Sequence, residues 1–200
     1  MPANNHDLHG NAPDTSSAVL IIVDMINDLE FPGGDELVPQ LIPVAERIAS
    51  LKARARKAGI PVVYANDNFG KWRSDFREVV DHVLNGDVKG KPLAEALRPD
   101  EDDYFVLKPK HSAFFATTLD TLLQYLGARH LILTGATGDT CVLFTASDAY
   151  MRDLHLHVPA DCTASIDPDE NARAIDYMAR VHHADVTPSG ELDLQKLARA

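Results

Sequence analysis

Short apolar runs alternate with amphipathic stretches along most of this 200-residue chain. The run Ala18–Val23 is apolar at every position, which is typical of a strand buried on both faces of a parallel sheet. From Leu37 to Lys57 the apolar residues recur at helical spacing, and Gly59-Ile60-Pro61 ends the pattern. The same reasoning predicts further strands at 61–65, 104–107, 130–133, 156–159 and 184–187, helices at 76–84, 119–126, 140–152, 168–181 and 192–198, and an irregular segment at 85–99.

Strands that alternate with helices favour an α/β fold, in which helices cover both faces of a parallel sheet. Right-handed crossovers make such a sheet doubly wound, so we expect a three-layer, Rossmann-like architecture with six strands in the order 3-2-1-4-5-6. This order places the carboxyl ends of the first and fourth strands side by side. We expect a single domain over residues 18–200, preceded by a mobile polar tail over residues 1–17.

Composition and charge narrow the possible function classes. The net charge of −11 argues against nucleic-acid binding, which favours basic patches, and against an anionic membrane surface. Two cysteines do not suggest a disulfide framework, so we expect a cytoplasmic protein. The polar N-terminus lacks the basic and then apolar order of a signal peptide, and no apolar run approaches the roughly 20 residues that span a bilayer.

Three of the predicted strands lead into a chemically reactive residue. Asp24 follows the first strand, Lys108 follows the third, and small residues connect the fourth to Cys141 at the start of a predicted helix. Ligands bind at the carboxyl ends of strands in open α/β sheets, so these side chains are candidates for one site. The N–H groups at a helix N-terminus pull a thiol toward the nucleophilic thiolate and can hold an oxyanion. The structural alternatives are a capping aspartate, a solvated lysine and a small buried cysteine.

The motifs around these residues resemble those of the isochorismatase-like cysteine hydrolase superfamily. They read Val23-Asp24-Met25-Ile26-Asn27-Asp28, Lys108-Pro109-Lys110-His111-Ser112-Ala113-Phe114 and Gly135-Ala136-Thr137-Gly138-Asp139-Thr140-Cys141-Val142, with Asp161 at a later strand end. The resemblance covers residues 18–187 and implies a catalytic triad of Asp24, Lys108 and Cys141. It also implies a cis peptide between Ala136 and Thr137, and we expect the backbone N–H groups of Thr137 and Cys141 to form the oxyanion hole.

Some positions depart from the superfamily's usual pattern. Gly138 stands where threonine is frequent, and His111 where an aromatic residue such as tyrosine is common. Nicotinamidases of this superfamily hold a metal with an Asp-x-His pair and a further histidine, whereas residues 66–73 contain no histidine here. We therefore expect no metal and no cofactor, and we expect nicotinamide to be a poor substrate.

Several residues near the predicted strand ends are candidates for the substrate pocket: Phe31, Asn66, Trp72, Arg73, His111 and Phe114. For the tryptophan and the two phenylalanines, the alternative is a structural role in the hydrophobic core. Arg73 either binds a substrate carboxylate with two hydrogen bonds or forms a surface ion pair with Asp75 or Glu78. Cys162 is expected to be buried and inert, and His182-His183 to form a turn.

These expectations combine in a metal-independent cysteine hydrolase that cleaves a small amide, carbamoyl or related carbonyl compound. Cys141 attacks the carbonyl and forms a thioester, Asp24 acts as general base and then general acid, and Lys108 stabilises the thiolate. Two alternatives stay open: a vinyl ether hydrolase of the isochorismatase type, which needs no cysteine nucleophile, and a non-catalytic member of the fold that binds protein. The resemblance also implies a homodimer or a larger homo-oligomer.

Overall fold

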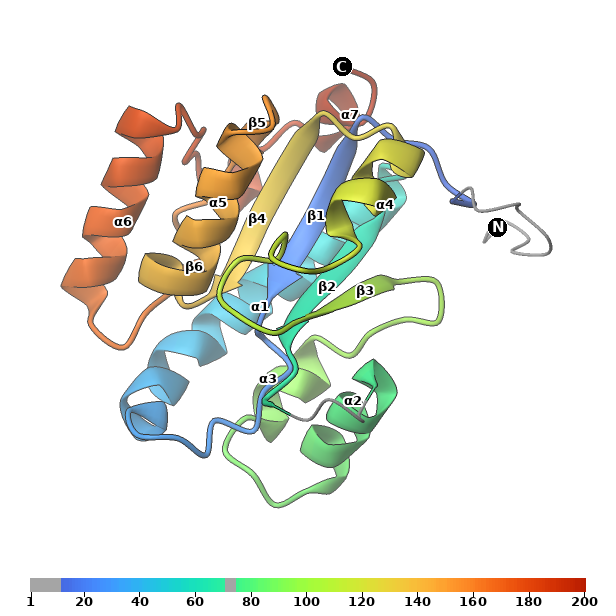
Figure 1. Cartoon of the computed structure of the whole chain (residues 1–200). Coiled ribbons are helices and arrows are strands. Elements are labelled where there is room, and N and C mark those ends of the chain that lie inside the picture. Colours follow the sequence, from blue (N-terminus) through green and yellow to red (C-terminus); the bar gives the residue numbers. More distant parts are fainter. Residues whose placement is uncertain (1–11, 71–74) are drawn as a thin grey trace.

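A parallel sheet forms the middle layer of the computed structural model, which describes residues 12–70 and 75–200 (Figure 1). Its strands lie in the order β3-β2-β1-β4-β5, and the short β6 pairs with β4. This arrangement confirms the predicted α/β class and the reversal of winding between the first and fourth strands. The strands are β1 (Ala18–Val23), β2 (Val62–Asp67), β3 (Tyr104–Lys108), β4 (His130–Ala136), β5 (His155–His157) and β6 (Thr163–Ala164).

Helices cover both faces of the sheet (Figure 1). One face carries α1 (Gly34–Lys57), α2 (Phe76–Asn85), α3 (Lys91–Ala96) and α7 (Leu194–Leu197), and the other carries α4 (Leu119–Leu126), α5 (Leu143–Tyr150) and α6 (Pro168–Val181). A π-helical turn (Gly138–Val142) precedes α5, and a 3-10 turn (Ser189–Glu191) precedes α7.

The central strand β1 explains the apolar run that opened the sequence pattern. Leu20 and Ile22 pack in the core on the α1 side, whereas Val19 and Ile21 pack in the core on the α5 side. All six residues of the strand are fully buried. Because both faces are covered, no polar position alternates with the apolar ones.

The sixth strand differs from the predicted one. The segment predicted at 184–187 contributes only a single parallel bridge, from Asp185 to His157, and β6 forms instead at Thr163–Ala164. The N–H of His155 donates to the Arg129 carbonyl, so an N–H at residue 159 would face β4 as well; Pro159 lacks it, which ends the pairing of β5 with β4. The fourth strand runs three residues further than predicted, and there Gly135 N–H donates to the carbonyl of Cys162.

Two further segments are more ordered than the sequence indicates. Residues 85–99 contain α3, because Pro92 occupies the first turn of a helix, where its missing N–H has no helical partner to lose. The expected mobile tail is described only from residue 12, and this part is held against the domain: Ser16 N–H donates to the Leu126 carbonyl at 2.9 Å, and Tyr104 Oη donates to Asp14 at 2.6 Å. Residues 1–11 lie outside the described residues.

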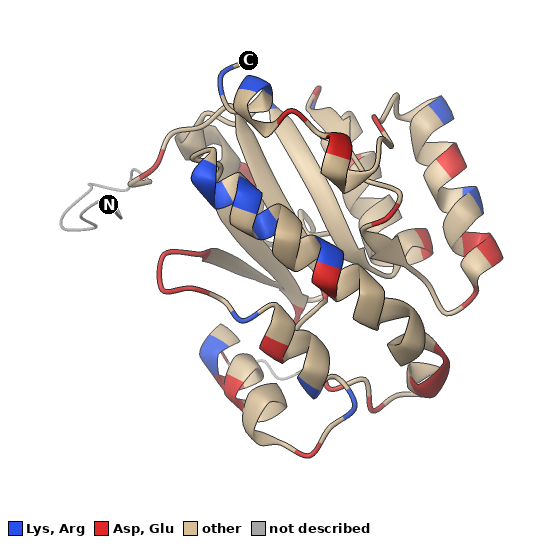
Figure 2. Ribbon diagram, turned by 180° about the vertical axis from the view of Figure 1, so that it is seen from behind, with Lys and Arg blue, Asp and Glu red and all other residues tan. Residues whose placement is uncertain are grey.

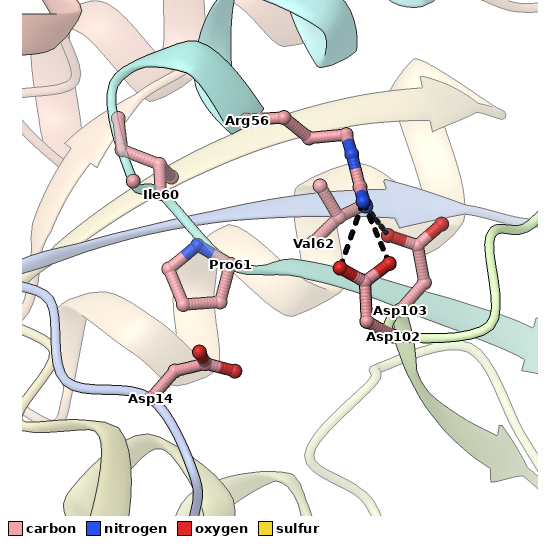
Figure 3. A pocket seen from close by; sticks show the side chains of 8 residues that line it. Asp14, Arg56, Ile60, Pro61, Val62, Asp102 and Asp103 are labelled. Carbon is pink, nitrogen blue, oxygen red and sulfur yellow. Dashed lines mark hydrogen bonds and ion pairs between the residues drawn. The ribbon is translucent and has the colours of Figure 1, made fainter. Parts of the chain in front are cut away.

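Charges on α1 match its dipole and fasten the loop before β3. Acidic residues lie in its first turn and basic ones in its last (Figure 2). In the last turn, Arg56 donates to Asp102 at 2.7 Å and to Asp103 at 2.9 Å across a cavity of about 400 Å³ (Figure 3). The buried Lys52 pairs with Asp103 at 2.6 Å. This cavity opens at the amino ends of the strands, and its ion pairs fix β3, which ends at Lys108.

Histidine rings gather at the outer edge of the sheet. His130 Nδ1 lies 3.1 Å from His157 Nε2, and His155 stacks on His130 with 4.8 Å between ring centroids. Burial lowers the pKa of His130, as do the charges of its histidine neighbours. Burial likewise lowers the pKa of His157, although Asp185 opposes the shift.

The free energy of unfolding is therefore expected to fall as the pH drops below about 6.5, the pKa of an unperturbed histidine. The unfolded chain binds protons in that range, which His130 and His157 resist in the folded state. Urea unfolding at about pH 7.5 and about pH 5.5 measures the difference. His130→Asn should reduce the pH dependence. Equal pH dependence in the variant and the unmodified protein would contradict this assignment.

None of the helices in the described ranges combines the length and the apolar character needed to span a bilayer.

Candidate active site

The three residues of the predicted triad lie close together at the carboxyl ends of three strands. Asp24 directly follows β1, Lys108 ends β3, and Cys141 lies in the π-helical turn after β4. The strands β2 and β1 lie between β3 and β4, yet the lysine side chain reaches across both. Its Nζ lies 2.6 Å from Asp24 Oδ2 and 3.6 Å from Cys141 Sγ. The lysine side chain is fully buried, so its charge is compensated by the Asp24 carboxylate and not by water.

Backbone contacts fix the carboxylate of Asp24. This residue has a φ of 51°, in the left-handed region that aspartate tolerates better than most residues. Its Oδ1 accepts a hydrogen bond of 2.7 Å from Asp67 N–H, and its own N–H donates to the Ala65 carbonyl at 3.0 Å. One carboxylate oxygen is thus held by β2 and the other faces Lys108. The orientation suits a group that must accept a proton from a fixed neighbour.

Glycine allows β4 to pass close to β1 beside Asp24. Gly135 has a φ of 112°, and a Cβ at this position would collide with the carbonyl oxygen of Val23. The next peptide bond, between Ala136 and Thr137, is cis, which confirms the bond implied by the family resemblance.

The cysteine loop also explains why glycine stands at position 138. A Cβ there would collide with Oδ1 of Asn171 on α6, so a threonine does not fit unless Asn171 moves. Asn171 contacts Ser165, whose Oγ donates to Asp139 Oδ1 at 2.8 Å. The turn before Cys141 is therefore held by side chains from the following segment of the chain.

The turn that carries Cys141 is wider than the predicted α-helix. Val142 N–H donates to the Thr137 carbonyl at 3.1 Å, a bond that spans five residues, and regular α-helix begins only at Leu143. Thr145 Oγ1 donates to the Cys141 carbonyl at 2.7 Å. Cys141 is partly exposed at this point, whereas Cys162 is fully buried.

The protonation states differ from the sequence-based expectation of a thiol drawn toward thiolate. Burial raises the pKa of Cys141 to about 12, and the neighbouring Asp24 charge adds to the effect. Burial also raises the pKa of Asp24 above its usual value, although Lys108 opposes the shift. Burial disfavours charge on Lys108, but its acidic neighbours, with Asp24 first among them, together outweigh burial and raise the pKa of the lysine. The resting site thus holds a neutral thiol beside a carboxylate of increased basicity.

A cavity of about 340 Å³ opens above these groups, and we call it the catalytic cavity. Of the predicted pocket residues, Phe31 and His111 line it, together with Thr137. Its other lining residues are Asp24, Asn27, Leu29, Leu37, Asp67, Phe69, Ala136, Thr140 and Cys141.

Two predicted pocket residues lie elsewhere. Asn66 is fully buried and donates from Nδ2 to the Ile26 carbonyl at 2.6 Å, so it supports the loop after β1 and does not line the catalytic cavity. Phe114 belongs to the core on the α5 side, where the guanidinium of Arg152 covers its ring at 4.5 Å. Trp72 and Arg73 lie outside the described residues.

Sequence reasoning passed over Asp67 and Phe69 as pocket residues. Asp67 ends β2, so it carries the same signal, a charged residue at a strand end, that selected Asp24 and Lys108. Its Oδ2 lies 3.8 Å from Lys108 Nζ. Within the described ranges, no three histidine, cysteine, aspartate or glutamate side chains are placed to hold a metal ion.

Comparison with known proteins agrees with this geometry. The pattern of the isochorismatase domain family matches residues 18–189. The chain belongs to the isochorismatase family. It is 41% identical over 173 residues to an uncharacterized isochorismatase family protein, YaaI of Bacillus subtilis, in a match that covers 86% of this chain and 94% of YaaI.

Two further isochorismatase relatives have a named activity. The ureidoacrylate amidohydrolase RutB of Methylorubrum extorquens is 33% identical over 185 residues, with 78% of this chain and 73% of RutB covered. The crystal structure of N-carbamoylsarcosine amidase from Thermoplasma acidophilum superposes with a TM-score of 0.67 at 28% identity, over 88% of this chain and 99% of that one. This chain is thus an isochorismatase-family hydrolase, and relatives in the family hydrolyse C–N bonds.

Proposed function

We propose that this protein is a metal-independent cysteine hydrolase that cleaves a small amide or carbamoyl compound through a thioester on Cys141. The observation that carries the proposal is the contact chain at the base of the catalytic cavity. Lys108 Nζ lies within 3.6 Å of the thiol and 2.6 Å of the Asp24 carboxylate. The named activities of RutB and of N-carbamoylsarcosine amidase, both C–N hydrolases, support this reaction class.

In this mechanism Asp24 takes the proton of the Cys141 thiol as the sulfur attacks the carbonyl carbon. The N–H groups of Thr137 and Cys141 receive the oxyanion of the tetrahedral intermediate. Asp24 then gives the proton to the leaving nitrogen, the C–N bond breaks, and ammonia or an amine departs. Water attacks the thioester with Asp24 again as base, which releases the acid and restores the thiol. Lys108 stays protonated throughout and stabilises the negative charge that moves between sulfur and carboxylate.

A substrate screen tests the proposed reaction class. Small amides, ureido acids and nicotinamide are incubated with the protein, and the release of ammonia is measured. Iodoacetamide labelling, read by mass spectrometry, should modify Cys141 before the fully buried Cys162. Vinyl ether cleavage with no amide turnover, or an unreactive Cys141 with no turnover at all, would overturn the proposal and favour one of the two alternative functions.

Activity is expected to survive dialysis against EDTA, because the described lining of the catalytic cavity offers a lysine-bound carboxylate pair and His111 as its single histidine. Nicotinamide should be turned over poorly relative to an aliphatic amide, since no metal would hold its ring nitrogen. Steady-state ammonia release before and after dialysis checks both points. Loss of activity that zinc or iron restores would contradict the metal-free mechanism.

We also expect at least a dimer. Phe115, Phe144 and Met151 are 55%, 51% and 70% exposed, and Phe144 and Met151 lie on or directly after α5. Phe144 and Met151 lie seven residues apart and so share one side of α5 and its C-terminal end, and large exposed apolar side chains on one side of a helix favour protein contacts. Light scattering at micromolar concentration should give a mass above that of one chain, and a monomer mass would contradict the expectation.

A further inference from the structure

A second cavity adjoins the catalytic cavity and shares two of its walls. Phe31 and Phe69 line both, and the second one, of about 450 Å³, continues outward between the segment 28–31 and α2. We call it the outer cavity. Neighbouring residues divide between the two, since Asn27 lines the catalytic cavity and Asp28 the outer one. The two cavities are therefore adjacent, an arrangement that suits a substrate extending beyond its reacting carbonyl.

The lining of the outer cavity has the chemistry of a site for an organic cation. Phe31 and Phe69, which line both cavities, are 37% and 40% exposed, so part of each residue is open to a ligand. The remaining lining residues are Asp28, Glu30, Glu78, Val79, His82 and Val83. Among the described residues that line it there is no lysine or arginine. Aromatic faces together with carboxylates attract ammonium and guanidinium groups.

The carboxylates of the outer cavity are only partly compensated. Lys89 lies 3.6 Å from Glu30 but closer, at 2.9 Å, to Asp35 outside the cavity. Asp28 faces the imidazole of His82 at 3.2 Å. Glu78, in the first turn of α2, has no ion pair within the described part of the chain. Among the described residues that line the outer cavity, carboxylates therefore exceed basic groups, and Figure 2 shows acidic segments beside basic ones around α2 and the start of α1.

We infer that the outer cavity binds the positively charged end of the substrate. The substrate is then an amide or carbamoyl compound with an ammonium or guanidinium group a few bonds from the carbonyl that reacts. This inference rests on the proposed function, because it takes Cys141 as the group that attacks that carbonyl. It stands as an alternative to a substrate carboxylate bound by Arg73, which lies outside the described residues.

Alkylation of Cys141 in the full-length protein tests the inference without a known substrate. Three N-substituted iodoacetamides with matched butyl tethers end in an ammonium, a methyl or a carboxylate group. The sulfur displaces iodide in each case, a C–S bond forms, and the thiol proton passes to Asp24 and then to solvent. We expect the ammonium reagent to label Cys141 about tenfold faster than the methyl reagent, and the carboxylate reagent to be the slowest. High salt should reduce these differences.

A matched pair of variants on α2 separates the outer cavity from the general charge of the protein. Glu78→Gln removes a lining carboxylate and should reduce the ammonium preference about threefold. Asp81→Asn removes the same charge from an exposed position on the same helix that does not line the cavity, and should leave the preference unchanged. The kcat/KM values for primary amides with the same three tether ends should follow the same order.

The outcomes distinguish this inference from the proposed function. Equal labelling of Cys141 by the three reagents, or an equal effect of the two variants, overturns the cation site and leaves the nucleophile assigned. Fastest labelling by the carboxylate reagent also overturns it and returns the anchoring role to a basic group such as Arg73. If no reagent modifies Cys141, the proposed function itself fails, and the inference fails with it.

Discussion

Replacement of Cys141 by alanine is expected to abolish amide hydrolysis, with kcat reduced by at least about 10⁴-fold. The thioester cannot form without the sulfur, and the hydroxyl groups that line the cavity among the described residues, those of Thr137 and Thr140, make no hydrogen bond to Asp24 there. The fold should be unaffected, because the side chain is small and only partly buried. Ammonia release and the circular dichroism melting curve measure the two effects separately.

Cys162→Ala is the matched control for this result. That thiol is fully buried in the core on the α1 side, so it has no access to substrate, whereas Cys141 is partly exposed. The control should retain turnover and lose some stability because a core side chain is truncated. Full activity in Cys141→Ala, or loss of activity in Cys162→Ala alone, would remove Cys141 from the mechanism.

The sheet and the triad could be predicted because both depend on short, local patterns. A strand covered on both faces must be apolar throughout, so β1 was recognisable from six residues. A charged residue directly after such a strand lies at the carboxyl edge of the sheet, which identified Asp24 and, on β3, Lys108. The reach of the lysine across two strand positions follows from its length, and only the structure supplies the 2.6 Å contact.

The pocket was harder to predict. Successive side chains of a strand point to opposite faces of the sheet, so a strand that is predicted too short leaves the direction of the residues beyond its predicted end unknown. The predicted second strand ended at Ala65, whereas β2 continues to Asp67. Asn66 therefore turns under the loop after β1, and Asp67, on the opposite face, reaches Lys108. The outer cavity had no local signal, because the segment 28–31 and α2 are brought together only by the fold.

Replacement of the proposed general base, Asp24, is expected to have the second large effect on activity, and it should also change the labelling of Cys141 in a way that a purely structural role would not. Asp24→Asn should reduce kcat by about 10²–10⁴-fold, because the amide cannot accept the thiol proton. The same change should lower the pKa of Cys141, since the Asp24 charge raises that pKa while Lys108 lowers it. Iodoacetamide should therefore label Cys141 faster at neutral pH in the variant, although turnover is lost. A variant that was merely misfolded would instead expose Cys141 and Cys162 together.

Stability supplies the remaining readout for Asp24→Asn. Lys108 is fully buried, and without Asp24 its nearest carboxylate is Asp67 at 3.8 Å. Removing one partner of a buried ion pair costs about 3–5 kcal/mol, so the melting temperature should fall clearly. Asp67→Asn is the comparison: its backbone N–H still donates to Asp24, the 2.6 Å pair persists, and the losses of activity and stability should be smaller. If Asp24→Asn retained turnover, or if its Cys141 labelled more slowly than in the unmodified protein, Asp24 would not be the group that holds the thiol proton.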